Sequence, residues 1–182
     1  FKDDPKAGED FVKTIINREL SLSEQAGLAT YYHAFGNEYW DKTSEIIAAA
    51  IDKSIEGSDI RARLLMMRGA FLVELGRYEE GEAAFRELAK ELDSPLVLNN
   101  LAYVVGVYLD QPAKGLEIAK QAAARAPRSA AIIDTVAVLY EHLGDSKKAS
   151  ETLEFLLQIS PSNAEAMARL ALIYADALNQ PE

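Results

Sequence analysis

The chain has 182 residues, of which 49 % are hydrophobic, and it carries a formal net charge of −10. This apolar content predicts a folded chain rather than long disorder. The acidic charge makes nucleic acid and anionic membranes poor partners, because phosphate-binding surfaces need a stripe of Lys and Arg. No apolar run approaches the roughly 18 residues that cross a bilayer, so we expect no membrane insertion. The absence of cysteine excludes disulfides and thiolate metal ligands.

The first 20 residues predict a linker and a short helix. Pro5 and Gly8 break a charged start, and Phe11 and Ile15 then share one face of a helix. Because the first residue is not a start methionine, we expect either a processed protein or a fragment of a longer one, and we favour the fragment. The compartment stays open: the cytoplasm is favoured, and the periplasm or secretion is the alternative.

Residues 21–57 predict a helical hairpin that departs from the spacing of the later chain. A capping-box pattern, in which a serine and a glutamate three residues later bond the first helix amides, opens one helix at Ser21 that runs to about Phe35. A second helix is expected over about 38–55. We interpret this hairpin as a degenerate repeat or an N-terminal cap. Trp40 is expected to pack against a neighbouring helix, with an exposed binding role as the alternative.

Residues 58–182 predict an array of repeats, because small and apolar residues return at a spacing of 34. Three columns keep that spacing: Gly81, Gly115 and Ala149; Phe85, Ala119 and Leu153; and Leu88, Ala122 and Leu156. A fixed period of this length indicates stacked helical units. Small residues also recur in the first helix of each unit, at Gly69, Ala102, Ala137 and Ala171. Antiparallel helices approach closely only where side chains are small, so we expect each unit to be a helix pair that crosses at these residues.

The third unit has the most regular pattern, with Val136, Ala137, Tyr140, Gly144, Asp145, Ala149, Leu153, Leu156 and Pro161. In these positions the units resemble tetratricopeptide repeats, divided as 62–95, 96–129 and 130–163, with a half unit or capping helix over 164–178. The second unit has one extra residue between Ala102 and Asp110, so its first helix is expected to end in a loose or widened turn. The resemblance implies an all-α fold: a right-handed α–α superhelix, which is a solenoid of antiparallel helix hairpins.

Motifs for catalysis or metal binding are absent from the sequence. The two histidines, His33 and His142, lie in different units and lack the HExxH spacing of a metal site. There is no glycine-rich phosphate loop and no GxSxG nucleophile motif. We therefore expect neither an enzyme nor a metal or other cofactor.

The resemblance also implies a surface for a partner, because first helices line the concave side in that family. The matching positions here are Arg63, Met66, Met67, Ala70, Val73, Glu74, Asn99, Asn100, Tyr103, Asp134, Thr135, Val138, Glu141, His142, Arg169 and Leu172. Methionine adapts to varied apolar shapes, and asparagine can pair with both groups of a peptide backbone. For Met66, Met67 and Val138 the alternative is a core position between repeats. The family's clamp for C-terminal carboxylates needs Lys and Asn where Met66 and Ala70 stand, so binding of chaperone tails is not expected.

The sequence therefore predicts a protein–protein interaction module that binds a peptide or a partner helix in its concave groove. The alternative is a structural, regulatory or self-associating scaffold segment of a larger protein, in which Leu170 and Tyr174 of the last helix contact a second molecule. The sequence does not identify the partner, the pathway or the oligomeric state.

Overall fold

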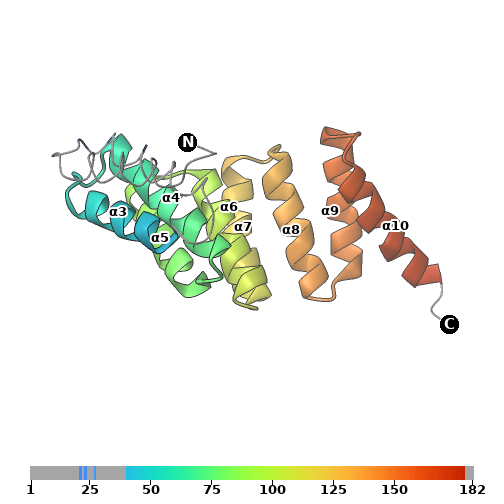
Figure 1. The fold of residues 1–182 in the computed structure, drawn as a ribbon. Helices are drawn as coiled ribbons and strands as arrows, with labels where there is room; N and C mark the ends of the chain where they lie inside the picture. The colour runs from blue at the N-terminus through green and yellow to red at the C-terminus, as the bar shows by residue number, and fades with distance from the viewer. Residues whose placement is uncertain (1–20, 22, 24–26, 28–39, 179–182) are drawn as a thin grey trace, which may run out of the picture.

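The computed structural model describes residues 21, 23, 27 and 40–178, and the regular structure in this part is helical throughout. Successive helices lie side by side from α3 at one end to α10 at the other (Figure 1). Their bounds are α3 Trp40–Asp52, α4 Asp59–Glu74, α5 Tyr78–Glu91, α6 Pro95–Tyr103, the π-helix η2 Val104–Tyr108, α7 Pro112–Arg125, α8 Ala130–His142, α9 Ser146–Ile159 and α10 Ala164–Leu178. The predicted all-α fold is confirmed. Expectations for residues 1–20, the helix that follows Ser21, His33 and the Trp40 side chain lie outside the described part.

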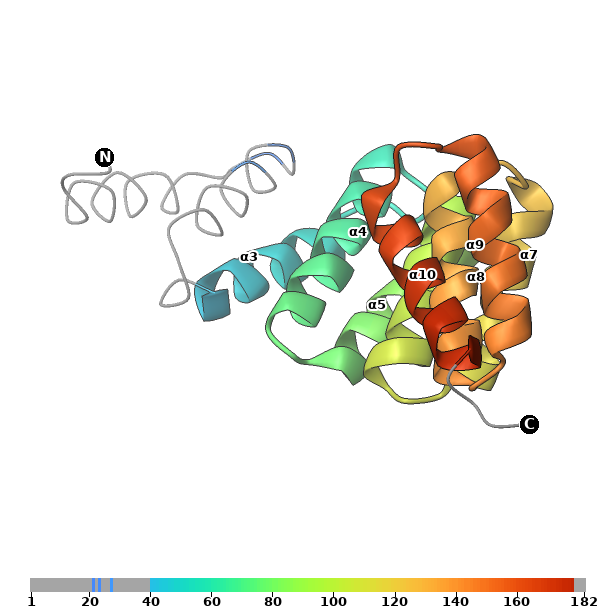
Figure 2. The same cartoon turned by 90° about the vertical axis from the view of Figure 1, so that its right-hand side faces the viewer.

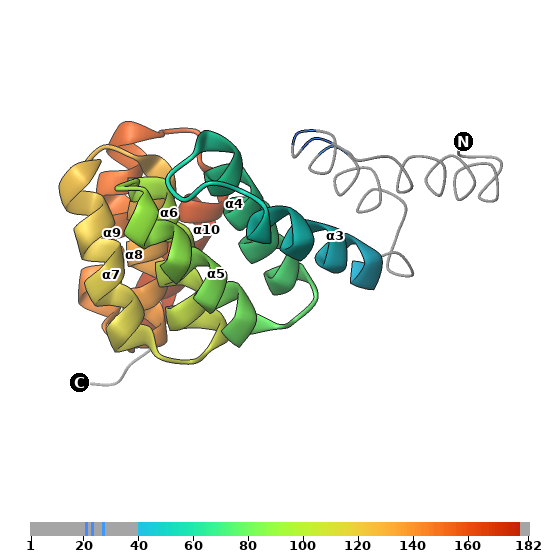
Figure 3. The ribbon, with the colours of Figure 1, turned by 90° about the vertical axis from the view of Figure 1, so that its left-hand side faces the viewer.

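Consecutive helices pack as antiparallel hairpins: α4 with α5, α6 with α7, and α8 with α9. Figures 2 and 3 view the stack from its α10 end and its α3 end. Gly76 and Gly144 end the first helices of two hairpins, each with φ 72. Positive φ costs glycine little, so these residues let the chain reverse within three residues. In the second hairpin Asp110 takes this conformation instead, with φ 52.

The hairpins cross at small residues, as the sequence predicts. Ala137 and Ala149 are fully buried in the third hairpin. In the first, a Cβ on Gly81 would lie 2.9 Å from Val73 Cγ2 and 3.2 Å from the carbonyl oxygen of Gly69. Ala171 differs from this column because it is exposed: α9 is the main neighbour of α10 among the described helices.

The core continues along the whole stack rather than within single hairpins. One cluster joins α3, the first hairpin and the start of α6 through Ile47, Leu65, Leu88 and Val97. The last cluster joins the third hairpin to α10 through buried Ala166 and the half-buried Leu170 and Ile173. Leu170 is thus a core contact and not the free contact surface that the scaffold alternative assigns to it.

The π-helix η2 ends the first helix of the second hairpin. The Leu109 amide donates to the Val104 carbonyl at 3.0 Å, the i to i+5 bond that defines a π-helix. This wider turn absorbs the extra residue between Ala102 and Asp110. The widened turn predicted from the sequence is therefore confirmed, and it takes a specific form.

Backbones of η2 and α7 touch directly where the π-helix meets the next helix. A Cβ on Gly115 would lie 2.6 Å from Gly106 Cα and 2.7 Å from the Ala102 carbonyl oxygen. Real Cβ atoms do not approach backbone atoms so closely, so any larger residue at Gly115 would push the helices apart. The second hairpin is thus the tightest of those with a glycine at the crossing.

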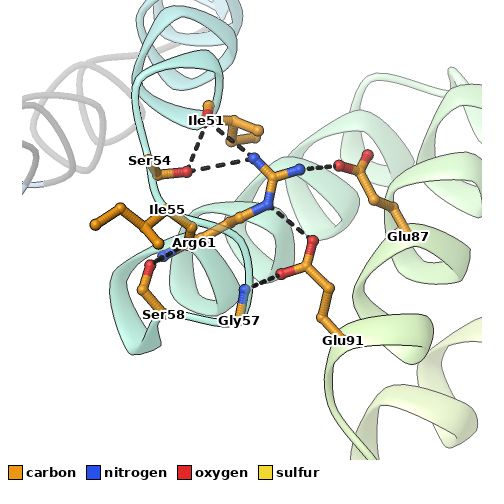
Figure 4. A network of polar contacts seen from close by, with 8 residues as sticks. All are labelled: Ile51, Ser54, Ile55, Gly57, Ser58, Arg61, Glu87 and Glu91. Atoms are coloured by element: carbon orange, nitrogen blue, oxygen red, sulfur yellow. Dashed lines mark hydrogen bonds and ion pairs between the residues drawn. The ribbon is translucent and has the colours of Figure 1, made fainter.

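An arginine at the start of α4 ties α3 to the first hairpin (Figure 4). Arg61 Nε donates to Glu91 Oε1 at 2.8 Å and Nη1 donates to the Ile51 carbonyl at 2.9 Å, while Nη2 donates to Glu87. The other oxygen of Glu91 accepts from the Gly57 amide at 3.0 Å. The hydrogen bond from Arg61 holds the pKa of Glu91 below its usual range. Burial raises this pKa, and the hydrogen bond from the Gly57 amide lowers it further. No sequence pattern predicted this network.

Removal of the Glu91 charge should destabilise the fold in a pH-dependent way. Glu91→Gln is expected to lower the free energy of unfolding by about 1.5–3 kcal/mol at neutral pH, the usual range for hydrogen bonds to charged groups. A lowered folded-state pKa stabilises the native state above the unfolded pKa, and this contribution is lost as pH falls through the folded value. The difference between parent and variant in urea unfolding should therefore shrink below about pH 4. The matched change at exposed Glu79 on the same helix should have little effect at any pH, and a pH-independent gap would contradict the assignment.

The crossing in the third hairpin gives a second prediction. Ala149→Leu should overpack the contact with α8 and destabilise by about 1–3 kcal/mol or more. Ala175→Leu, on the exposed side of α10, should leave the urea midpoint near that of the parent. Equal midpoints for the two variants would show that the helix register is wrong.

Candidate functional site

The first helices of the hairpins form a row. Asn100 Nδ2 of α6 donates to Met66 Sδ of α4 at 3.5 Å. The next helix in the row, α8, contacts α6, and Arg169 joins α10 to α8. We call the surface formed by the candidate residues of α4, α6, η2, α8 and α10 the first-helix face.

A hollow of ≈ 390 Å³ opens on this face where α4, α6 and η2 meet. Its lining residues are Ala70, Val73, Glu74, Phe85, Asn99, Asn100, Tyr103, Val104 and Tyr108. We call it the Tyr103 hollow. It brings together six residues of the first-helix face that the sequence singled out for partner binding: Ala70, Val73, Glu74, Asn99, Asn100 and Tyr103. Phe85, Val104 and Tyr108 were not expected there.

Three tyrosines from different helices meet beside this hollow. Tyr108 stacks on Tyr78 of α5, with ring centroids 4.6 Å apart and planes 7° apart. Tyr103 meets Tyr108 edge to face at 5.4 Å. Burial raises the pKa of the Tyr103 hydroxyl, so it stays protonated at neutral pH. The sequence did not predict this group of tyrosines; it indicated only that the helix is irregular here, through the extra residue that produces η2.

Asn99 is the polar residue set deepest in the hollow, with 8 % of its surface exposed. Its Oδ1 accepts no hydrogen bond from any residue that the structure describes. A buried acceptor without a partner costs about 1–3 kcal/mol, so such groups call for an explanation. A donor supplied by a bound partner would remove that cost.

Arg169 of α10 is held by two carboxylates of α8. Its Nη1 donates to Asp134 Oδ1 at 2.6 Å, and Nε and Nη2 donate to Glu141 Oε1 at 3.0 and 2.8 Å. Burial lowers the pKa of Arg169, but the bonds and charges of Glu141 and Asp134 outweigh it and the net shift is upward. The sequence candidates Asp134 and Arg169 therefore bind each other.

The other sequence candidates lie outside both groups. Arg63 and His142 are exposed, and Val138 is half-buried. Met66 packs against two core clusters. Met67 packs against the cluster around Leu64, so it contacts the core.

Two negative findings apply to the described ranges alone. No three or more His, Cys, Asp or Glu side chains there are arranged to hold a metal ion. Within the same ranges, every helix is too short or too polar to cross a membrane.

The chain is similar to known proteins in sequence and in structure. A family model described as "Tetratricopeptide repeat" matches residues 62–91. The predicted resemblance to the tetratricopeptide-repeat family is thus confirmed. "Tetratricopeptide repeat protein 8" of Mus musculus is 29 % identical over 118 residues, which cover 63 % of this chain and 22 % of that protein. The chain thus spans about a fifth of the length of the curated relatives that it matches. The family is a non-catalytic one, in agreement with the expectation that the chain is not an enzyme.

Solved structures share the fold at low sequence identity. A MamA double mutant has a TM-score of 0.74 at 14 % identity, over 87 % of this chain and 85 % of that one. YrrB, described as a TPR protein with an unusual peptide-binding site, has a TM-score of 0.68 at 16 % identity, over 93 % of this chain and 84 % of that one. The first TPR of Spaghetti (RPAP3), bound to an HSP90 peptide, has a TM-score of 0.61 at 21 % identity, over 65 % of this chain and 96 % of that one. These identities establish the fold alone.

Loss of the arginine between α8 and α10 should loosen the end of the stack. Arg169→Met keeps an apolar stem and leaves Asp134 and Glu141 without their donor. We expect a loss of about 1–3 kcal/mol in unfolding free energy and faster amide hydrogen exchange in α10. The matched change Arg128→Met, at an exposed loop position, should shift neither measurement. Equal behaviour of the two variants would contradict a stabilising role for the pair.

Proposed function

We propose that the first-helix face binds a segment of a partner protein, as an extended peptide or a helix, with the Tyr103 hollow at its centre. The observation that carries this proposal is Asn99, which lines the hollow beside a half-buried tyrosine and whose buried amide oxygen has no hydrogen-bond partner among the described residues. A peptide backbone offers N–H donors that suit this acceptor. Tyr103 can supply apolar contact and a hydroxyl in the same place.

The family supports a general role in protein interaction. Two structural neighbours are described as having a peptide-binding site or as bound to a peptide. The side chains argue against an HSP90-type peptide for this chain, because the clamp positions hold Met66 and Ala70 in place of lysine and asparagine. Met66 is also engaged by Asn100 and by the core. The proposed partner is therefore held by its backbone and side chains rather than by a terminal carboxylate.

Self-association through α10 is the second candidate. Met167, Leu172 and Tyr174 are 45 %, 65 % and 44 % exposed on that helix. Tyr174 also donates to Glu154 of α9, so part of this surface is occupied within the chain. The proposal therefore ranks the Tyr103 hollow first.

Truncation of the central residues tests the proposal. Asn99→Ala combined with Tyr103→Ala should abolish capture of peptides from a random library displayed on phage, because central aromatics carry about 2 kcal/mol or more of binding energy at hot spots. The free energy of unfolding should stay within about 1–2 kcal/mol of the parent, since an unpaired amide contributes little.

The control keeps the same chemistry on a second helix. Phe155→Ala with Gln158→Ala removes an exposed aromatic and an exposed amide three residues apart on α9, and capture should survive. If the Asn99/Tyr103 variant stays folded and still captures peptides, the working surface lies elsewhere and α10 becomes the first candidate. If it unfolds, those residues are core.

A further inference from the structure

Charge around the Tyr103 hollow is predominantly negative. The exposed carboxylate of Glu74 lines it, and no Lys or Arg is among its described lining residues. Asp134 and Glu165 lie close enough to raise the pKa of Tyr103 further, and Arg169 only partly offsets them. The charged residues that define this face are three carboxylates, Glu74, Asp134 and Glu141, against two guanidinium groups, Arg63 and Arg169. Glu165 of α10 adds a further carboxylate close to Tyr103.

Arg169, whose charge acts on Tyr103, is not available to a ligand. Arg169 directs three nitrogens at Asp134 and Glu141, and its side chain is 15 % exposed. Two carboxylates share this single cation, so the group as a whole remains negative. An acidic ligand would meet repulsion here, and no Lys or Arg among the described lining residues would offset it.

Aromatic rings supply the second feature. Tyr108 is 41 % exposed and Tyr103 is half-buried, and both line the hollow. Tyr78 covers one face of the Tyr108 ring. Tyrosine rings attract ammonium and guanidinium groups through the negative charge of the ring face.

The unpaired amide oxygen of Asn99 is independent of both features. It is a hydrogen-bond acceptor on a side chain that is more than nine-tenths buried. Lysine and arginine side chains only donate, whereas a carboxylate only accepts. The carboxylates and the ring faces therefore favour a cation, and this acceptor requires a donor, which lysine and arginine also provide.

We infer that the Tyr103 hollow receives a positively charged side chain, an arginine or a lysine, from the partner segment. This inference rests on the proposed function and specifies the chemistry of the partner. Arginine is the better fit, because its planar group can lie against a tyrosine ring while it donates to Asn99 and to a carboxylate. The overall charge of −10 would also speed the encounter with a basic partner.

Selection from the random peptide library tests the chemistry directly. Peptides whose capture depends on Asn99 and Tyr103 should be enriched in arginine or lysine at one position. A synthetic peptide of the selected sequence should bind about three- to thirtyfold more weakly when that arginine is replaced by citrulline, its uncharged analogue. Fluorescence anisotropy at low and high salt should show binding that weakens as salt rises.

Charge-neutral variants of the protein provide a second measurement. Glu74→Gln and Glu165→Gln should each weaken the arginine peptide and reduce its salt dependence, but leave the citrulline peptide unchanged. Glu151→Gln, an exposed carboxylate on α9, is the matched control and should change neither peptide. Citrulline binding that equals arginine binding would overturn the inference.

The selection separates the two proposals. Peptides that depend on Asn99 and Tyr103 but are neutral or acidic would overturn the basic-partner inference and leave the proposed function standing. Peptides that bind regardless of the Asn99/Tyr103 change, or a library that yields no binder, would overturn both.

Discussion

Close approach of two helices at small residues is the constraint on which this structure depends. Each hairpin places a glycine or alanine of its second helix against the backbone of its first. In the second hairpin Gly115 leaves no space for a Cβ, because Ala102 and Gly106 already touch it. The extra residue of the second unit is absorbed by a wider turn at this same contact, since Gly106 lies within that turn. The π-helix at Val104–Tyr108 is the result.

The same constraint shapes the candidate site. Because η2 is held tightly against α7 by Gly106 and Gly115, its other side presents Val104 and Tyr108 to the hollow. Tyr108 then bridges Tyr78 of the previous hairpin and Tyr103 of its own. π-Helical turns occur frequently at functional sites, since they redirect side chains that a regular helix would place elsewhere. The irregular turn and the hollow are thus two consequences of one inserted residue.

Spacing in the sequence was enough to predict the stacked hairpins and the place of the widened turn. The resemblance to the repeat family, and not the spacing alone, placed Ala70, Asn99, Asn100 and Tyr103 on one face. It could not reveal Tyr78 and Tyr108 as neighbours, since their contact crosses helices and depends on the π-turn. The pair Arg61 and Glu91 was missed for a related reason: charges 30 residues apart leave no periodic trace. For Met67 the sequence left a surface position and a core position open, and its side chain packs against the core cluster around Leu64.

The fold and the chemistry of this face come from different parts of the sequence. Small and apolar columns determine the stack, and proteins at 14–21 % identity share it. The residues that a partner would meet are largely free of that requirement, so their charge can differ from one protein to another. Here Asp134 and Glu141 together bind Arg169, which stabilises the junction between α8 and α10 and leaves an excess of negative charge. The ion group that holds the end of the stack in place therefore also acts on Tyr103, whose pKa Asp134 raises and Arg169 lowers.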